Sequence, residues 1–135
     1  MCSADVHYED PFVGEPLEGP AAIGRHAERL WSGFPDMRAD TSGERLAQGR
    51  FVAAPVKVAG TNSGELDGLP PTRKFVVVQT VLYCELTPEA DALLRIRVFC
   101  DRWEAAVQLG LLPKPGGLGE KALLALRGFG LNPRR

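Results

Sequence analysis

The chain has 135 residues, of which 44% are apolar and 24% charged, as in one ordinary globular domain. The formal net charge is -1, and acidic and basic residues are mixed along the chain. This pattern excludes a nucleic-acid-binding stripe and a polybasic membrane patch. Three cysteines without short spacing exclude a disulfide framework, and no apolar run is long enough to cross a bilayer. We therefore expect a cytoplasmic protein with reduced thiols.

The first third of the chain predicts a strand, a loop and a helix. Residues 6–10 alternate and place Val6, Tyr8 and Asp10 on one face of a short strand, with His7 on the other. A Gly/Pro-rich loop follows over residues 12–18, and Gly19-Pro20 has the composition of a helix start. Apolar residues then recur at helical spacing up to Phe34, which predicts one amphipathic helix that ends near Gly33. On this spacing we expect His26 on the exposed side of the helix.

The rest of the chain is mostly strand. We expect strands over residues 37–41, 50–59, 74–86 and 92–101, a long polar turn over 60–72, a short helix over 102–111 and a last helical turn over 121–126. Pro55 indicates a sheet edge or a bulge. In the last strand, one face is expected to carry Leu94, Ile96, Val98 and Cys100. The other face carries Arg95, Arg97, Phe99 and Asp101. One early helix followed by long strands predicts an α+β fold with a mostly antiparallel sheet.

Five segments resemble one family in the same order along residues 6–113. The strand Val6-His7-Tyr8-Glu9-Asp10-Pro11-Phe12 resembles the one that carries the catalytic aspartate of ketosteroid isomerases. Phe34-Pro35-Asp36, the segments at 60–65 and 68–72, and Arg97-Val98-Phe99-Cys100-Asp101 with the Gln108–Pro113 tail are similar to pieces of SnoaL-like polyketide cyclases. No single segment is specific, but the ordered set favours this family.

The resemblance implies a cone-shaped, strongly curved sheet wrapped around a helix and an apolar pocket. It implies one domain over residues 1–135, with the core at about 6–113 and a tail at 114–135. Two features depart from the family. We expect its usual N-terminal helix before the first strand to be missing or replaced, the alternative being a start codon further upstream, and Asn62 stands where SnoaL-like cyclases have histidine. Since asparagine cannot transfer a proton near neutral pH, the usual cyclase mechanism is in question.

Asp101 is the first candidate catalytic residue, because the resemblance places it where SnoaL-like cyclases keep their general acid/base. In an apolar pocket, desolvation would raise the pKa of this carboxyl toward the working pH. The alternative is that Asp101 caps the helix that begins near Arg102.

Asp10 is the second candidate, because it matches the proton-abstracting aspartate of ketosteroid isomerases, a reaction that serves as a standard example of pKa tuning. The alternative is ordinary Asp-Pro turn chemistry. We expect the two carboxylates to converge on one pocket, where mutual repulsion would keep one protonated. A bulge near Cys100 would place that thiol in the pocket instead.

The expected substrate is a hydrophobic, carbonyl-bearing small molecule, and we expect no metal or organic cofactor. Asn62 or Gln79 would hold an enolate oxygen, and Arg97 is a further candidate for substrate binding. The alternative for Arg97, as for Arg95, is an ion pair that keeps Asp101 ionised. An aromatic lining would come from Tyr8, Trp31, Phe34 and Phe99. The alternative for the aromatic residues is plain core packing. The predicted function is a cyclase or isomerase. Water activation of the epoxide hydrolase type and a non-catalytic binding or accessory module remain alternatives.

Two predictions concern surfaces. The apolar outer side of the strands at 74–86 and 92–101 is too large to remain exposed to solvent, which favours a homodimer through that face. The leucine-rich tail, with Phe129 and Leu131 near its end, is expected to fold back over the open mouth of the cone or to be exchanged with a partner subunit.

Overall fold

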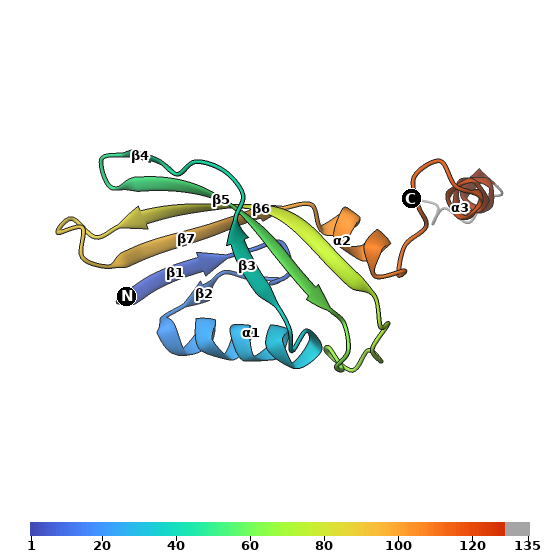
Figure 1. Cartoon of the computed structure of the whole chain (residues 1–135), viewed down its shortest axis with the longest axis horizontal. Coiled ribbons are helices and arrows are strands. Elements are labelled where there is room, and N and C mark those ends of the chain that lie inside the picture. Colours follow the sequence, from blue (N-terminus) through green and yellow to red (C-terminus); the bar gives the residue numbers. More distant parts are fainter. Residues whose placement is uncertain (129–135) are drawn as a thin grey trace.

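The computed structural model describes residues 1–128 and has an α+β fold (Figure 1). Its strands are β1 (Cys2–Glu9), β2 (Leu17–Glu18), β3 (Arg38–Thr41), β4 (Leu46–Gln48), β5 (Phe51–Thr61), β6 (Phe75–Leu86) and β7 (Leu93–Cys100). Its helices are α1 (Pro20–Gly33), α2 (Arg102–Gln108) and α3 (Leu118–Gly128). The sheet order is β2-β1-β7-β6-β5-β3, and β4 also pairs with β5. Only β1 and β7 pair in parallel, so the predicted, mostly antiparallel α+β architecture is confirmed.

The register of the strands decides which side chains face α1. Tyr8 lies opposite Ile96, Ile96 opposite Cys84, and Cys84 opposite Val52, so these four share one face of the sheet. The sheet curves, and α1 runs along this concave side against β1 and β2 (Figure 1). Residues of the other parity, such as Glu9, form the outer face. As predicted from alternation, the Val6, Tyr8 and Asp10 face points inward.

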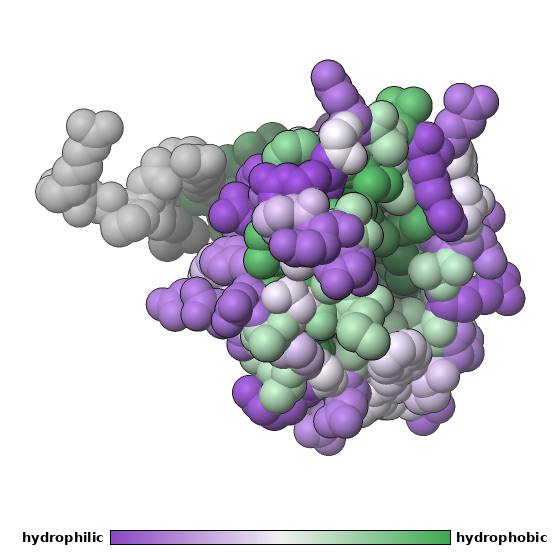
Figure 2. Space-filling view, turned by 90° about the vertical axis from the view of Figure 1, so that its left-hand side faces the viewer, coloured by the Kyte–Doolittle hydropathy of each residue, from purple (hydrophilic) through white to green (hydrophobic). Residues whose placement is uncertain are grey.

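The concave face is only partly covered. Within residues 1–128, the buried apolar residues are Val6, Ala59, Val76 and Ala105, and of these Val6 is fully buried. Most apolar side chains that face α1 from β5, β6 and β7 are half-buried instead. Seen from one end, the molecule has apolar atoms in a hollow that polar side chains surround (Figure 2). The sheet and α1 therefore leave an open, apolar recess between them.

Pro55 shows how the sequence shapes the sheet edge. β3 pairs with the part of β5 at Val56–Ala59, and β4 pairs with Phe51–Ala53, so Pro55 falls between the two partners. Its missing N–H is therefore not needed by either ladder, as the sequence indicated. The short strands β2 and β4 were not predicted, since two or three residues carry too little alternation to recognise.

The tail does not fold back over the recess, so the first form of that prediction was wrong; exchange with a partner subunit stays a prediction. α3 packs against no other described element and lies beyond α2, away from α1 and the sheet (Figure 1). Its leucines are exposed, Leu118 by 86%. Phe129 and Leu131, which belong to the same prediction, lie outside the described residues. No described helix has the length and apolarity that a membrane span requires.

Candidate functional site

The carboxylate of Asp10, directly after β1, is the best-connected polar group in the described structure. Its side chain is 3% exposed. Oδ1 accepts the backbone N–H groups of Phe12 at 2.6 Å and Val13 at 3.0 Å. Oδ2 accepts the Tyr8 hydroxyl at 2.7 Å and lies 2.7 Å from His26 Nε2. Four donors therefore satisfy the four lone-pair positions of a carboxylate.

The local sequence explains half of this arrangement. Pro11 ends β1, and the chain turns so that Val13 N–H also reaches the carbonyl of Asp10. Burial by itself raises the pKa of Asp10, but the hydrogen bonds from Tyr8, Phe12 N–H and His26 together lower it below the ordinary 3.8. Asp10 is therefore a stable anion at neutral pH.

His26 supplies the donor from α1, and its position corrects the expectation of an exposed histidine. The residue is 7% exposed, and its ring centroid lies 5.7 Å from that of Tyr8. The apolar stripe predicted for α1 was rotated from the buried face, because it was drawn from apolar residues alone: Trp31 is exposed, while His26 and Gly33 are the buried residues of the helix. The buried carboxylate of Asp10 is what draws this polar side chain inward.

The hydrogen-bond partners fix which nitrogen of His26 holds the proton. Nδ1 lies 3.2 Å from Nη2 of Arg29, and a guanidinium can only donate. Nδ1 is therefore the acceptor, and Nε2–H donates to Asp10. An aspartate that holds a histidine in one tautomer is the arrangement that orients a base in hydrolases.

Tyr8 and Cys100 complete the inner face at this point. Burial raises the pKa of Tyr8 well above its ordinary value of 10.0, and the hydrogen bond to Asp10 raises it further, so Tyr8 stays a donor. Burial also raises the pKa of Cys100 above 9.0, with a smaller contribution from the charge of Asp10. Since the thiolate is the nucleophile, Cys100 is unsuited to nucleophilic catalysis.

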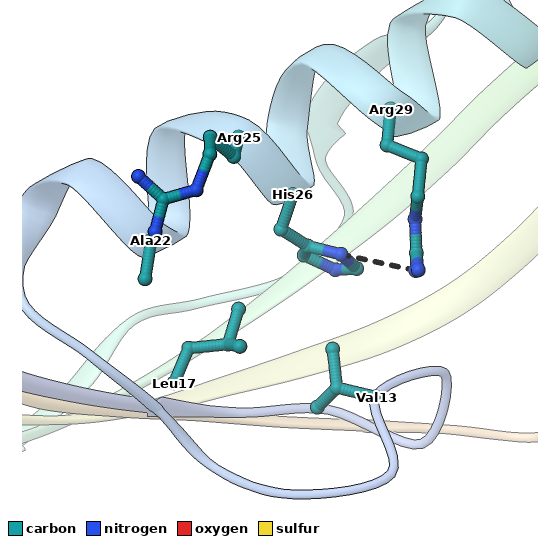
Figure 3. Close-up of a pocket in the computed structure, with 6 residues that line it drawn as sticks. All are labelled: Val13, Leu17, Ala22, Arg25, His26 and Arg29. Carbon is teal, nitrogen blue, oxygen red and sulfur yellow. Dashed lines mark hydrogen bonds between the residues drawn. The ribbon is translucent and has the colours of Figure 1, made fainter.

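A cleft of about 250 Å³ opens beside His26 between α1 and the loop that follows β1 (Figure 3). It is lined by Val13, Leu17, Ala22, Arg25, His26 and Arg29. The ring edge with Nδ1 faces this cleft and the Arg29 guanidinium (Figure 3). The sequence reasoning missed Arg25 and Arg29. Their signal was their spacing, since residues 22, 25, 26 and 29 lie on adjoining faces of one helix.

Asp101 does not join this site. It is exposed and caps α2, where its side chain accepts Glu104 N–H at 3.0 Å. The register between β6 and β7 is continuous from Thr80 to Glu85, so no bulge changes the parity near Cys100. Cys100 consequently shares the face of Asp10, and Asp101 falls on the outer parity. The expected convergence of the two carboxylates does not occur, and the capping alternative describes Asp101.

Asn62 is buried, 5% exposed, but every polar atom of its amide is used by the protein. Nδ2 donates to the carbonyls of Gly33 and Gly64, each at 3.1 Å, and Oδ1 accepts Thr72 N–H at 2.8 Å. The amide therefore fastens the loop over 61–72 to the end of α1. Phe34, the residue that follows α1, packs beside Gly60 at this same corner.

The remaining predicted binding residues lie apart from Asp10. Trp31 is 51% exposed, and Gln79 is exposed on the outer parity of β6. Arg97 pairs on the outer face with Glu9, Nε to Oε1 at 2.5 Å, and its guanidinium lies 5.1 Å from the ring centroid of Phe99. Of the other predicted site residues, therefore, only Tyr8 bonds to Asp10, while Arg97 and Phe99 contact each other on the outer face. Residues 1–128 hold no cluster of His, Cys, Asp or Glu suited to a metal ion.

Comparison with known proteins agrees with this fold. The family profile of the SnoaL-like polyketide cyclases matches residues 1–89, and the chain belongs to that family. Comparison with curated proteins finds no match.

Solved structures share the fold at low sequence identity. AclR from Streptomyces galilaeus, a proposed hydroxylase, is 20% identical with a TM-score of 0.70, over 95% of this chain and 78% of its own. A proposed SnoaL-like polyketide cyclase from Jannaschia sp. CCS1 is 19% identical with a TM-score of 0.72, over 83% and 75%. SalBIII, an epoxide hydrolase/cyclase-like enzyme in pyran ring formation in the polyether salinomycin, is 25% identical with a TM-score of 0.60, over 76% and 74%. These neighbours are named for different activities, so the fold alone does not select one.

Proposed function

We propose that the protein is an acid–base enzyme, of the cyclase or isomerase type, for an apolar carbonyl compound. His26 Nδ1 is the catalytic base, and Asp10 is a positioning residue that acts through His26. One observation carries this proposal. The buried Asp10 holds His26 in a single tautomer whose free nitrogen faces a cleft.

The proposed proton transfer is complete without a further reactant. Nδ1 takes a proton from the carbon next to the carbonyl, and the C–H electron pair moves to the carbonyl oxygen as an enolate. Asp10 stabilises the imidazolium that forms, and the positive charge of Arg29 stabilises the enolate oxygen. Return of the proton to another carbon gives an isomer. Attack of the enolate on a second carbonyl forms a C–C bond, and the resulting alkoxide takes the proton from His26.

Arg29 must move for this step, because its Nη2 donates a hydrogen bond to His26 Nδ1 in the described structure. Its side chain is 38% exposed, so the guanidinium has room to turn from Nδ1 toward the enolate oxygen. Catalytic hydrogen bonds commonly rearrange when a substrate binds. Asp10 itself is a poor proton acceptor, since four donors already occupy it and its pKa is lowered.

Exchange of α-protons tests this proposal without knowledge of the natural substrate. 2-Tetralone, an apolar ketone, is incubated in D₂O with each protein, and loss of the α-proton signal is followed by NMR. We expect His26→Gln and Asp10→Asn to slow the exchange by about 100-fold or more relative to the wild type. Asp101→Asn is the matched control, because it changes another aspartate at a strand end, and it should keep the wild-type rate.

Two outcomes contradict the proposal. If Asp101→Asn removes exchange while His26→Gln retains it, the original prediction of Asp101 as the base is right. If the wild type does not accelerate exchange at all but apolar ketones raise its melting temperature, the protein belongs to the second class, a non-catalytic binding module. The fully used amide of Asn62 and the open recess favour that second class.

We also propose a homodimer through the outer sheet face. Large apolar side chains are exposed there on three adjoining strands: Phe51 by 40%, Phe75 by 57%, Val81 by 41%, Tyr83 by 38% and Phe99 by 49%. Exposed apolar clusters of this kind mark association surfaces. Light scattering at micromolar concentration should give twice the mass of 14.6 kDa, and Phe99→Asp should give a monomer. A wild-type monomer contradicts this proposal.

A further inference from the structure

The cleft beside His26 holds two arginines that are only partly used by the protein. We propose that it binds the carboxylate of a small organic acid with an apolar body. The inference deepens the proposed function. It rests on that function for one point only, namely that the bound acid is the substrate. Binding itself requires no turnover.

The two arginines stand at i and i+4 on α1 and both line the cleft, one on each side of His26 (Figure 3). Arg25 is exposed and forms no ion pair with any residue of the described range 1–128. None of the six lining side chains is acidic. A concave surface with cations and no lining acid attracts an anion.

One N–H group of Arg29 lacks an acceptor within residues 1–128. Nη2 bonds to His26, but the buried Nε has no hydrogen-bond partner within the described residues. The nearest carboxylate is Asp67 Oδ1, 3.6 Å from Nε and on a side chain that is 54% exposed. That separation is too long for a hydrogen bond. Since a guanidinium edge offers two parallel N–H groups, it fits the two oxygens of a carboxylate.

Apolar side chains on both sides of the cleft select the body of the acid. Val13, Leu17 and Ala22 present alkyl groups to the cleft (Figure 3). The volume of about 250 Å³ is below the range of about 300–1,000 Å³ typical of pockets for drug-sized ligands. A compact acid such as benzoate combines the required charge with a fitting apolar ring.

Carboxylate binding also bears on the base. A carboxylate that engages Arg29 competes with its hydrogen bond to His26 Nδ1, and loss of that bond exposes the nitrogen to the rest of the ligand. The substrate class that follows is a small carbonyl compound that carries a carboxylate. Arg25 and Arg29 would bind the carboxylate of such a ligand, and the C–H group next to its carbonyl would face His26.

Benzoate is the probe, and benzamide is its uncharged counterpart of nearly the same shape. Each is titrated into ¹⁵N-labelled protein, and backbone amide shifts are followed over residues 13–17 and 22–29. We expect saturable shifts with benzoate in the wild type and none with benzamide. Arg25→Gln with Arg29→Gln should weaken benzoate binding at least tenfold, because a charge-assisted pair is lost. Arg25→Gln alone should weaken it by a smaller factor.

Arg38→Gln is the matched control, because Arg38 lies on β3 outside the cleft with a side chain 71% exposed, and it should bind like the wild type. The single variant of exposed Arg25 keeps the test valid if the double variant does not fold. The proposal is overturned if benzamide binds as well as benzoate, if Arg25→Gln binds like the wild type, or if benzoate does not saturate. None of these results affects exchange of the neutral ketone, so failure here is distinguishable from failure of the proposed function.

Discussion

Asp10 and Asp101 stand at equivalent places and have opposite environments. Each follows the last residue of a strand, and those strands, β1 and β7, pair in parallel. The side chain of Asp10 is 3% exposed and has four hydrogen-bond donors. Asp101 is exposed and has one, the N–H of Glu104. The difference is one of parity, since Asp101 stands an odd number of residues after Ile96, which lies on the inner face.

The comparison shows what a buried carboxylate needs. Removing a charge from water costs several kcal/mol unless donors replace the water. Around Asp10 these donors come from three places: Tyr8 on the same strand, two N–H groups of the following turn, and His26 on α1. The carboxylate of Asp101 stays hydrated, so the single hydrogen bond of the helix cap is sufficient for it. The following predictions separate these two situations, from the largest expected effect to the smallest.

Asp10→Ala should be the most destabilising change. It leaves Tyr8, His26 and two backbone N–H groups without their acceptor, so we expect the free energy of unfolding to fall by about 3–5 kcal/mol. Urea denaturation measures this loss. Asp101→Ala, the matched change at the other strand end, should cost only about 1 kcal/mol as a lost helix cap. Equal losses would show that the burial difference has no energetic consequence.

Asn62→Ala should destabilise less than Asp10→Ala but more than Asp101→Ala. Three backbone groups lose their partner, the carbonyls of Gly33 and Gly64 and the N–H of Thr72. An unsatisfied buried group costs about 1–3 kcal/mol, and part of this cost is relieved where water enters. We expect a loss of about 2 kcal/mol in urea denaturation, with proton exchange on 2-tetralone retained. Loss of exchange in a folded Asn62→Ala protein would show that Asn62 belongs to the active site.

Acid should weaken the Asp10 cluster selectively. Because the pKa of Asp10 in the folded protein lies below its ordinary 3.8, the ionised form stabilises the fold. This contribution is complete above pH 3.8 and is lost as the pH falls from there through the pKa of the folded state. The pKa of Asp36 is also lowered, mainly by the hydrogen bond from the N–H of Thr61. The acid sensitivity of the whole protein therefore does not report on Asp10 alone.

The specific quantity is the stability difference between the wild type and Asp10→Asn. It should be constant from pH 7 to about pH 5 and shrink below pH 3.8. The same difference for Asp101→Asn should stay nearly flat. A wild-type advantage over Asp10→Asn that grows on acidification would reverse the sign of the proposed interaction.

Glu9→Gln should have the smallest effect. Glu9 and Arg97 form their ion pair on the outer face, with side chains 37% and 43% exposed. Pairs that water reaches contribute about 0–1 kcal/mol. We expect urea denaturation to show a loss below about 1 kcal/mol that decreases further in high salt. A larger loss that salt does not reduce would indicate that this pair is desolvated, as in the proposed dimer.

Much of the fold could be predicted because its signals are local. Alternation gave the inward face of β1, Pro20 gave the start of α1, and Pro55 marked a gap between edge partners. The site was harder, because partners far apart in sequence decide it. Nothing near His26 in the sequence reports that Asp10 lies 2.7 Å away, and the helical stripe drawn from apolar residues excluded it. Asp101 shows the reverse case, in which a family pattern suggested a pocket that the strand parity does not allow.

The tautomer of His26 tests the central claim most directly. Long-range ¹H–¹⁵N correlation spectra of the wild-type protein at neutral pH distinguish the two ring nitrogens. Our account predicts a proton on Nε2, which donates to Asp10, and an unprotonated Nδ1 that is available as the base. A proton on Nδ1, in either the neutral or the charged ring, would contradict it.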